Sequence, residues 1–290
     1  MVGHVGKGRG TRGSGPNSLG QVSDIPAGSG QPNAASGPPA LALRRLVKRF
    51  GKTLAVAELD LDVPIGSFFG LVGPNGAGKT TTLSMTTGIL RPDAGTAFVL
   101  GNDVWSDPVV AKRLLGVLPD GMALFDRLTG AQLLEYVGRL HGLDRELAVR
   151  RTAELLDVLD LKAAADILVI DYSAGMTKKI GLACALIHGP RILVLDEPFE
   201  SVDPVSATTI RGILHSFVGG GGTVVLSSHV MALVEQLCDQ VAIIAAGRVL
   251  ATGRLADVRG DGSLEDRFVE LVGGRRDLGE GLAWLRSSSG

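Results

Sequence analysis

The stretch Gly73-Pro-Asn-Gly-Ala-Gly-Lys-Thr80 decides the fold, because it has the spacing G-x-x-x-x-G-K-[ST] of a phosphate-binding loop. It follows a short apolar run, SFFGLVG, that is typical of a strand, and it leads into KTTTLSMTTGIL, which is typical of a helix. Backbone N–H groups form an anion-binding nest only where side chains stay small, and the following helix points its positive end at the same place. The sequence therefore predicts a nucleoside triphosphate site.

Each residue type in this loop suits a part of the triphosphate. Lys79 is expected to bridge the β- and γ-phosphates, Thr80 to ligate Mg²⁺, and Thr81 to reach the α-phosphate. The whole predicted phosphate-binding set is Gly73, Pro74, Asn75, Gly76, Ala77, Gly78, Lys79, Thr80 and Thr81.

A pair of acids follows a second apolar run. Ile192–Leu195 leads directly into Asp196 and Glu197, and carboxylates at the end of a buried strand are where α/β proteins hold ligands. Asp196 is suited to hold Mg²⁺ through water, and Glu197 to orient or polarise the attacking water. The alternative is that both are ordinary solvated acids at a strand end.

The pattern around these motifs predicts an α/β fold: a P-loop NTPase core with a mainly parallel sheet, an N-terminal antiparallel β region and a helical insertion. Residues 41–63 alternate like half-buried strands, and residues 107–183 have mostly helical spacing. From residue 191 strands alternate with helices, ending in a predicted strand over residues 240–250.

Composition excludes several classes of protein. The 29 Lys+Arg and 30 Asp+Glu residues give a formal net charge of −1, which does not favour nucleic-acid binding by bulk charge. The two cysteines, Cys184 and Cys238, lie in apolar contexts and are expected to be small core residues of a reducing compartment. No apolar run is long enough to span a bilayer, and the N-terminus lacks the apolar region of a secretory signal.

Three further motifs resemble those of the ATP-binding cassette (ABC) ATPases. Ser173-Ala-Gly-Met176 resembles the signature motif, Ser201-Val-Asp-Pro204 the D-loop, and Ser228-His229 the switch histidine. The order of all five motifs matches that family from about residue 41 to 255. The resemblance covers the phosphate loop and the acidic pair as well, so it is specific.

The resemblance implies a role for each matching residue. It implies ATP and Mg²⁺ as cofactors, with Glu197 and His229 as catalytic residues, and Phe50 stacking on adenine. It also implies that two cassettes pair head to tail, each ATP lying between one phosphate loop and the partner's signature turn. The residues expected there are Ser173, Ala174, Gly175 and Met176 of the signature and Asp203 of the D-loop.

Two positions depart from the family pattern. Asp120 stands where the family usually has a glutamine that senses Mg²⁺; its oxygen could still contact Mg²⁺ through water, but the side chain is shorter and charged. Ala174 stands where glycine is usual. Hydrolysis is expected to survive both changes, and a cassette that binds ATP without hydrolysing it is the alternative. The apolar stretch Gly121–Phe125 either receives a short helix from a membrane subunit or packs into the helical insertion's own core.

The chain is expected to divide into three parts. Residues 1–39, with 10 of the 41 glycines and 5 of the 13 prolines, are interpreted as a disordered tail. Residues 40–255 form the ABC ATPase domain, with the helical insertion at about 121–185. Residues 256–290 form a C-terminal helical extension, in which Ser263–Asp266 resembles a capping box and an amphipathic helix docks on its own domain.

The leading hypothesis is an ATPase subunit that energises a membrane exporter of the two-component drug or polyketide type. It would act as a peripheral protein at the cytoplasmic face of the membrane, with a separate permease and a second cassette as partners and no nucleic acid. The alternatives are a soluble ABC ATPase acting on a ribosome or DNA complex, and an importer ATPase.

Overall fold

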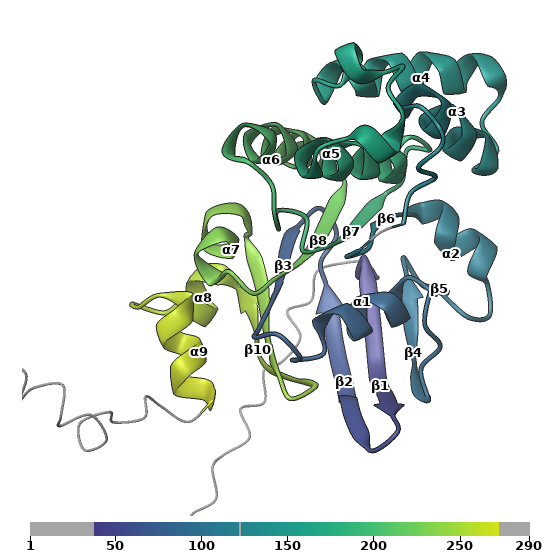
Figure 1. The fold of residues 1–290 in the computed structure, drawn as a ribbon. Coiled ribbons are helices and arrows are strands. Elements are labelled where there is room, and N and C mark those ends of the chain that lie inside the picture. Colours follow the sequence, from purple (N-terminus) through teal and green to yellow (C-terminus); the bar gives the residue numbers. More distant parts are fainter. Residues whose placement is uncertain (1–37, 122, 273–290) are drawn as a thin grey trace, which may run out of the picture. The chain divides into compact units, whose positions relative to one another are not determined.

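The computed structural model describes residues 38–121 and 123–272, which contain two β-sheets (Figure 1). The smaller sheet is antiparallel in the order β2-β1-β4-β5. Its strands are β1 (Leu41–Phe50), β2 (Thr53–Val63), β4 (Ala94–Val99) and β5 (Asn102–Asp103). This confirms the antiparallel β region predicted for the N-terminal part, although sequence patterning pointed only to β1 and β2.

The larger sheet has six strands in the order β10-β9-β3-β8-β7-β6. Its strands are β3 (Phe68–Val72), β6 (Leu115–Leu118), β7 (Ile192–Asp196), β8 (Thr223–Ser228), β9 (Gln240–Ala245) and β10 (Arg248–Arg254). All neighbours pair in parallel except β9 and β10. The single strand predicted over residues 240–250 is wrong, because Ala246 and Gly247 both take positive φ and turn the chain into a hairpin.

The six-stranded sheet separates two apolar cores, because its central strands are buried on both faces. In β7, Leu193 and Leu195 belong to one core, and Ile192 and Val194 belong to the other. This alternation explains why the strands appear in the sequence as continuous apolar runs.

Helices fill both cores. The first core is covered by α3 (Gly130–Leu140), α4 (Arg145–Val158), α5 (Ala174–Leu186), α6 (Pro204–Gly219) and α7 (Met231–Leu237). The second lies under the smaller sheet and contains α1 (Lys79–Thr86) and α2 (Pro108–Leu114), so α1 is held between the two sheets (Figure 1). The predicted α/β class is confirmed.

Side-chain caps fix where the helices of the middle segment begin. Thr129 and Gln132 form a reciprocal capping box at α3, Asp144 accepts from the Leu147 N–H at α4, and Ser173 accepts from the Met176 N–H at α5. Two single-turn helices, Lys162–Ala164 and Val169–Asp171, connect α4 to α5.

The C-terminal part contains two helices, α8 (Leu255–Arg259) and α9 (Leu264–Val272). The Asp266 N–H donates to Ser263 Oγ at 3.0 Å, as the capping pattern predicts. Leu264 is fully buried in the first core, so α9 docks on its own domain. Within residues 38–121 and 123–272, no helix combines the length and apolar character that crossing a membrane requires.

The domain boundaries stay a prediction. Residues 1–37 of the predicted tail and 273–290 of the predicted extension lie outside the described part of the chain.

Gly116 in β6 lies where the sheet and α5 approach each other closely. A Cβ added there would lie 2.1 Å from the Ala185 carbonyl oxygen and 2.7 Å from Leu193 Cδ2. Only a residue without a side chain fits, since a backbone carbonyl in a helix cannot move aside.

Gly116→Ala is expected to lower the free energy of unfolding by about 1–3 kcal/mol, the usual cost of overpacking a core. Gly212 is the matched control, because it lies on the exposed side of α6 with nothing within 4 Å of an added Cβ. Gly212→Ala should raise stability by about 0.5–1 kcal/mol in urea unfolding, because alanine is the better helix former. Equal effects at both sites would refute the packing argument.

Two histidines stack where α3 and α5 end. The rings of His141 and His188 are 3.8 Å apart and nearly parallel. His188 Nε2 donates to the Leu115 carbonyl of β6 at 2.9 Å, while its buried Nδ1 has no hydrogen-bond partner among residues 38–121 and 123–272. Burial lowers the pKa of His188 to about 4, the charges of His141 and Arg151 act in the same direction, and the Leu115 hydrogen bond opposes them.

Acidification is therefore expected to lower the free energy of unfolding through the buried His188. An unfolded histidine takes up a proton below about pH 6.5, but His188 in the folded chain does so only near 4, so acidification across that range favours the unfolded chain. About 1–2 kcal/mol should be lost there, after allowing for the partial exposure of the ring. His188→Gln keeps a donor for Leu115 but cannot titrate, so urea unfolding between pH 7 and 4 should show a shallower loss than the wild type. An identical slope would contradict the assignment.

Candidate nucleotide-binding site

The register of the parallel sheet brings the predicted motifs to one edge. Val72 at the end of β3 pairs with Ser228 of β8, and Asp196 at the end of β7 pairs with Ser227. The phosphate loop, the acidic pair and His229 follow directly after these paired positions, and Asp120 follows β6 two residues after its last strand residue. The carboxyl edge of a parallel sheet is the usual ligand site of such folds.

The glycines of the phosphate loop serve different purposes. Gly76 has φ of +78° with open space around it, whereas a Cβ on Gly73 would lie 2.1 Å from the Ile244 carbonyl oxygen and one on Gly78 2.5 Å from that of Ala55. The loop therefore needs two of its glycines to pack against β2 and β9. From the sequence, all three glycines were expected to serve the phosphate nest. Gly73 and Gly78 are also required for close packing, whereas Gly76 is not.

Lys79 is buried, and its ammonium group is held by the loop itself. Its Nζ donates to the carbonyls of Gly73 at 2.8 Å and Pro74 at 3.3 Å, and lies 3.7 Å from Glu197 Oε1. A desolvated cation held in this way attracts a polyanion strongly, because little water screens it.

The two acids are held in different ways. Asp196 is buried, and one of its carboxylate oxygens accepts a hydrogen bond from Ser227 Oγ. Glu197 has φ of +46°, and its N–H donates to the same Ser227 Oγ at 3.0 Å. A glutamate in the left-handed region is strained by about 1–3 kcal/mol, which the surrounding contacts must offset.

His229 contacts the second acid. Its Nδ1 lies 3.0 Å from Glu197 Oε1, and its side chain is 38% exposed where that of Glu197 is 12% exposed. Glu197 Oε1 thus lies between an imidazole and the Lys79 ammonium. This pair is placed for proton exchange beside a phosphate cradle.

A single cleft of about 400 Å³ gathers most of the predicted residues. It is lined by Phe50, Ala55, residues 75–81, Asp120, Glu197, Glu200 and His229. Phe50 is 51% exposed at the end of β1, so its ring is accessible to a planar ligand. Lys48 Nζ lies over the ring, 5.9 Å from its centroid.

The residues predicted to hold Mg²⁺ also lie together. Thr80, Asp120 and Asp196 line one groove beside α1, and their hydroxyl and carboxylate oxygens are the donors that Mg²⁺ prefers. In the described residues, no three carboxylate, histidine or cysteine side chains form a metal cage. These oxygens fit an Mg²⁺ that is completed by phosphate and water.

The signature turn (Ser173–Met176) lies outside this cleft, against the D-loop. A Cβ on Gly175 would lie 2.7 Å from Asp203 Oδ2 and 2.8 Å from Ser206 Oγ. Asp203 caps α6 by accepting from the Val205 and Ser206 N–H groups, and its hydrogen bonds, first that with the Ser206 side chain, lower its pKa. The structure therefore brings these two motifs together but separates them from the phosphate loop.

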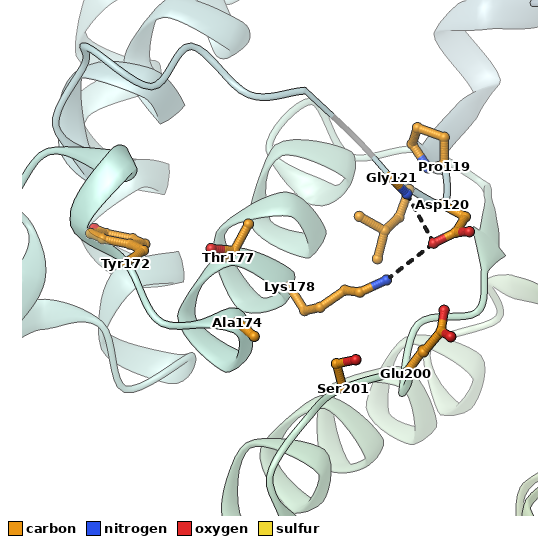
Figure 2. Close-up of a pocket in the computed structure, with 10 residues that line it drawn as sticks. Pro119, Asp120, Gly121, Tyr172, Ala174, Thr177, Lys178, Glu200 and Ser201 are labelled. Atoms are coloured by element: carbon orange, nitrogen blue, oxygen red, sulfur yellow. Dashed lines mark hydrogen bonds and ion pairs between the residues drawn. The ribbon is translucent and has the colours of Figure 1, made fainter.

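Two signature residues face different surroundings. Met176 is partly buried against the first core. Ala174 lines a second pocket of about 340 Å³, together with Asp120, Lys178 and Ser201 (Figure 2).

Ser227 and Lys178 belong to the site but were not predicted from the sequence. Ser227 bridges the two acids, and Lys178 Nζ donates to the Glu197 carbonyl at 3.1 Å. The position of Ser227, two residues before His229, was the available signal, because it lies opposite Asp196 once the strands are paired. No local pattern marks Lys178.

The stretch Gly121–Phe125 was expected either to receive a short helix from a membrane subunit or to pack into the helical insertion's own core. Leu124 packs against the first core, whereas Phe125 is 55% exposed and meets Tyr136 edge to face at 5.3 Å. Met122 lies outside the described residues. Leu124 thus packs into the first core, which the helices of the insertion share with the sheet, whereas Phe125 and Tyr136 are exposed.

A glycine-rich loop between a parallel strand and a helix, with an acid at the end of another strand of the same sheet, defines the class of P-loop nucleotide-binding proteins. The ABC transporter family profile matches residues 56–200. The chain belongs to this family of transport ATPases, as the five motifs predicted.

Named relatives place it more closely. It is 40% identical over 214 residues to the daunorubicin/doxorubicin resistance ATP-binding protein DrrA of Streptomyces peucetius, covering 74% of this chain and 65% of that protein. It is 37% identical over 214 residues to the Nod factor export ATP-binding protein I of Cupriavidus metallidurans, covering 74% of this chain and 71% of that protein. A solved ATP-binding subunit of an ABC transporter superposes with a TM-score of 0.75 at 28% identity, over 80% of this chain and 99% of the other. These relatives confirm the resemblance to exporter-type cassettes.

Proposed function

We propose that this chain hydrolyses ATP to energise a membrane exporter, with Glu197 as the general base. The observation that carries this is the placement of Glu197 Oε1 in the phosphate cleft, 3.7 Å from Lys79 Nζ and 3.0 Å from His229 Nδ1. A carboxylate held between two nitrogen groups beside a phosphate cradle suits attack by water on a terminal phosphate.

Each residue has a distinct task in this proposal. The N–H groups of the loop and Lys79 bind the β- and γ-phosphates, and Phe50 stacks on the adenine ring. Glu197 accepts the proton of the attacking water, which contributes about 10²–10⁴ to the rate for general bases. His229 holds the carboxylate in place and faces the γ-phosphate. Thr80 would ligate Mg²⁺ directly, with Asp196 and Asp120 holding it through water, and the ion would neutralise phosphate charge.

A second cassette completes the site. The α5 N-terminus, where Ser173 and Gly175 lie, carries free N–H groups suited to a γ-phosphate, but it lies outside the chain's own cleft. A head-to-tail pair would place it against the partner's nucleotide. Ala174 adds one methyl group at that surface.

A separate permease supplies the membrane part and selects the cargo. The exposed Phe125–Tyr136 pair, which follows the Asp120 loop, offers an apolar surface for a permease segment. The chain would then act at the cytoplasmic face of the membrane. The relatives named for drug resistance and Nod factor export support export as the direction of transport.

Lys79→Ala should abolish nucleotide binding, because it removes the desolvated cation of the cradle. Equilibrium binding of a fluorescent ATP analogue measures this, and Lys52→Ala is the matched control, because Lys52 is exposed and is not among the residues that line the cleft. Wild-type affinity in Lys79→Ala would overturn the assignment of the loop.

Glu197→Gln should retain ATP binding while lowering turnover by about 10²–10⁴, since glutamine keeps the shape but cannot take the proton. A dimer stabilised by ATP should accumulate, and size-exclusion chromatography with and without ATP detects it. Normal turnover of this variant would exclude Glu197 as the general base.

A further inference from the structure

One lysine connects three motifs that lie far apart in the sequence. Lys178 belongs to α5, five residues after Ser173, and its side chain is 18% exposed. Its Nζ donates to the Glu197 carbonyl at 3.1 Å. The same Nζ lies 3.9 Å from Asp120 Oδ1 (Figure 2). In the view of Figure 2 the ammonium group points from the signature helix toward the Asp120 loop.

The backbone that this lysine contacts is strained. Glu197 has φ of +46°, a conformation that a glutamate side chain disfavours. Three contacts hold it: its N–H donates to Ser227 Oγ at 3.0 Å, and its carbonyl accepts from Lys178 Nζ at 3.1 Å and from the Glu200 N–H at 3.2 Å. Of these, only the contact with Lys178 comes from the helix that begins at the signature turn.

We propose that Lys178 is a positioning residue, which transmits the position of the signature helix to the general base of the same chain. The inference rests on the proposed function of Glu197. The direction of the Glu197 side chain depends on its backbone conformation, and Lys178 fixes one end of that backbone to α5. When a partner's nucleotide binds the N-terminus of α5, any shift of this rigid helix reaches the Glu197 carbonyl through one side chain.

Asp120 modulates the same contact. Its carboxylate is 47% exposed and forms an ion pair with Lys178. Asp120 also lines the nucleotide cleft. The family's usual glutamine carries no charge with which to hold an ammonium group. The aspartate in this chain therefore suits a neighbouring lysine, and the ammonium group sits between two functional loops.

Lys178→Met removes the charge and keeps the length of the side chain. We expect kcat for ATP hydrolysis to fall about 10- to 100-fold, the effect of misplacing a catalytic group by about 1 Å. The KM for ATP should stay within about twofold, because Lys178 is not among the residues lining the nucleotide cleft. Lys178→Arg should recover most of kcat, since guanidinium also donates to a carbonyl. Lys162→Met is the matched control, because the side chain of that lysine is 81% exposed and its ion-pair partner among the described residues is Asp157.

A double variant separates positioning from a general loss of structure. In Lys178→Met with Glu197→Gln, single-turnover hydrolysis should be within about twofold of Glu197→Gln alone, because a residue that acts through Glu197 has nothing left to position. A full additional 10-fold loss in the double variant would overturn the proposal. Unchanged kcat in Lys178→Met, or no recovery in Lys178→Arg, would do so as well.

The outcome is distinguishable from failure of the proposed function. If the wild type does not hydrolyse ATP, or if Glu197→Gln turns over normally, the general-base assignment fails. If both behave as expected while Lys178→Met matches the wild type, only the inference about Lys178 fails. Thermal unfolding of each variant shows whether a lost rate reflects a lost fold.

Discussion

The site depends on one constraint, the parallel pairing of β3, β8 and β7. This register places Ser227 opposite Asp196, so that one hydroxyl group holds both the Asp196 carboxylate and the Glu197 N–H. A slip of one residue would turn every side chain of β8 to the other face of the sheet and move Ser227 away from both acids. Apolar residues on both faces fix the register, because each face fills a separate core.

Much of this arrangement can be predicted from local sequence. The phosphate loop, the acidic pair and His229 each follow an apolar strand, and strands of a parallel sheet end at a common edge. The α/β class follows from the same pattern. The hairpin at Ala246 and Gly247 was missed because the apolar run continues through the turn. The role of Lys178 could not be predicted either, since it depends on how α5 packs against the loop after β7.

The signature turn lies apart from the cleft, so under the proposed head-to-tail pairing the chain would carry two half-sites. Because Gly175 has no side chain, the start of α5 packs closely against Asp203 and Ser206. The signature turn and the D-loop therefore lie side by side. Lys178 of α5 donates to the carbonyl of Glu197, the residue whose φ is strained, so α5 links the signature turn to Glu197. Under the proposed head-to-tail pairing, this connection would link the nucleotide that the chain binds to the nucleotide that its partner presents.

At Glu197 the backbone lies in the left-handed region, which lowers the stability of the fold, while the side chain supplies the carboxylate that the proposed hydrolysis needs. Glycine or asparagine would adopt this φ with less strain, and neither offers a carboxylate to take a proton. The left-handed φ at Glu197 therefore costs stability at the position where the proposed function requires a carboxylate, so a gain in stability there would come at the expense of turnover.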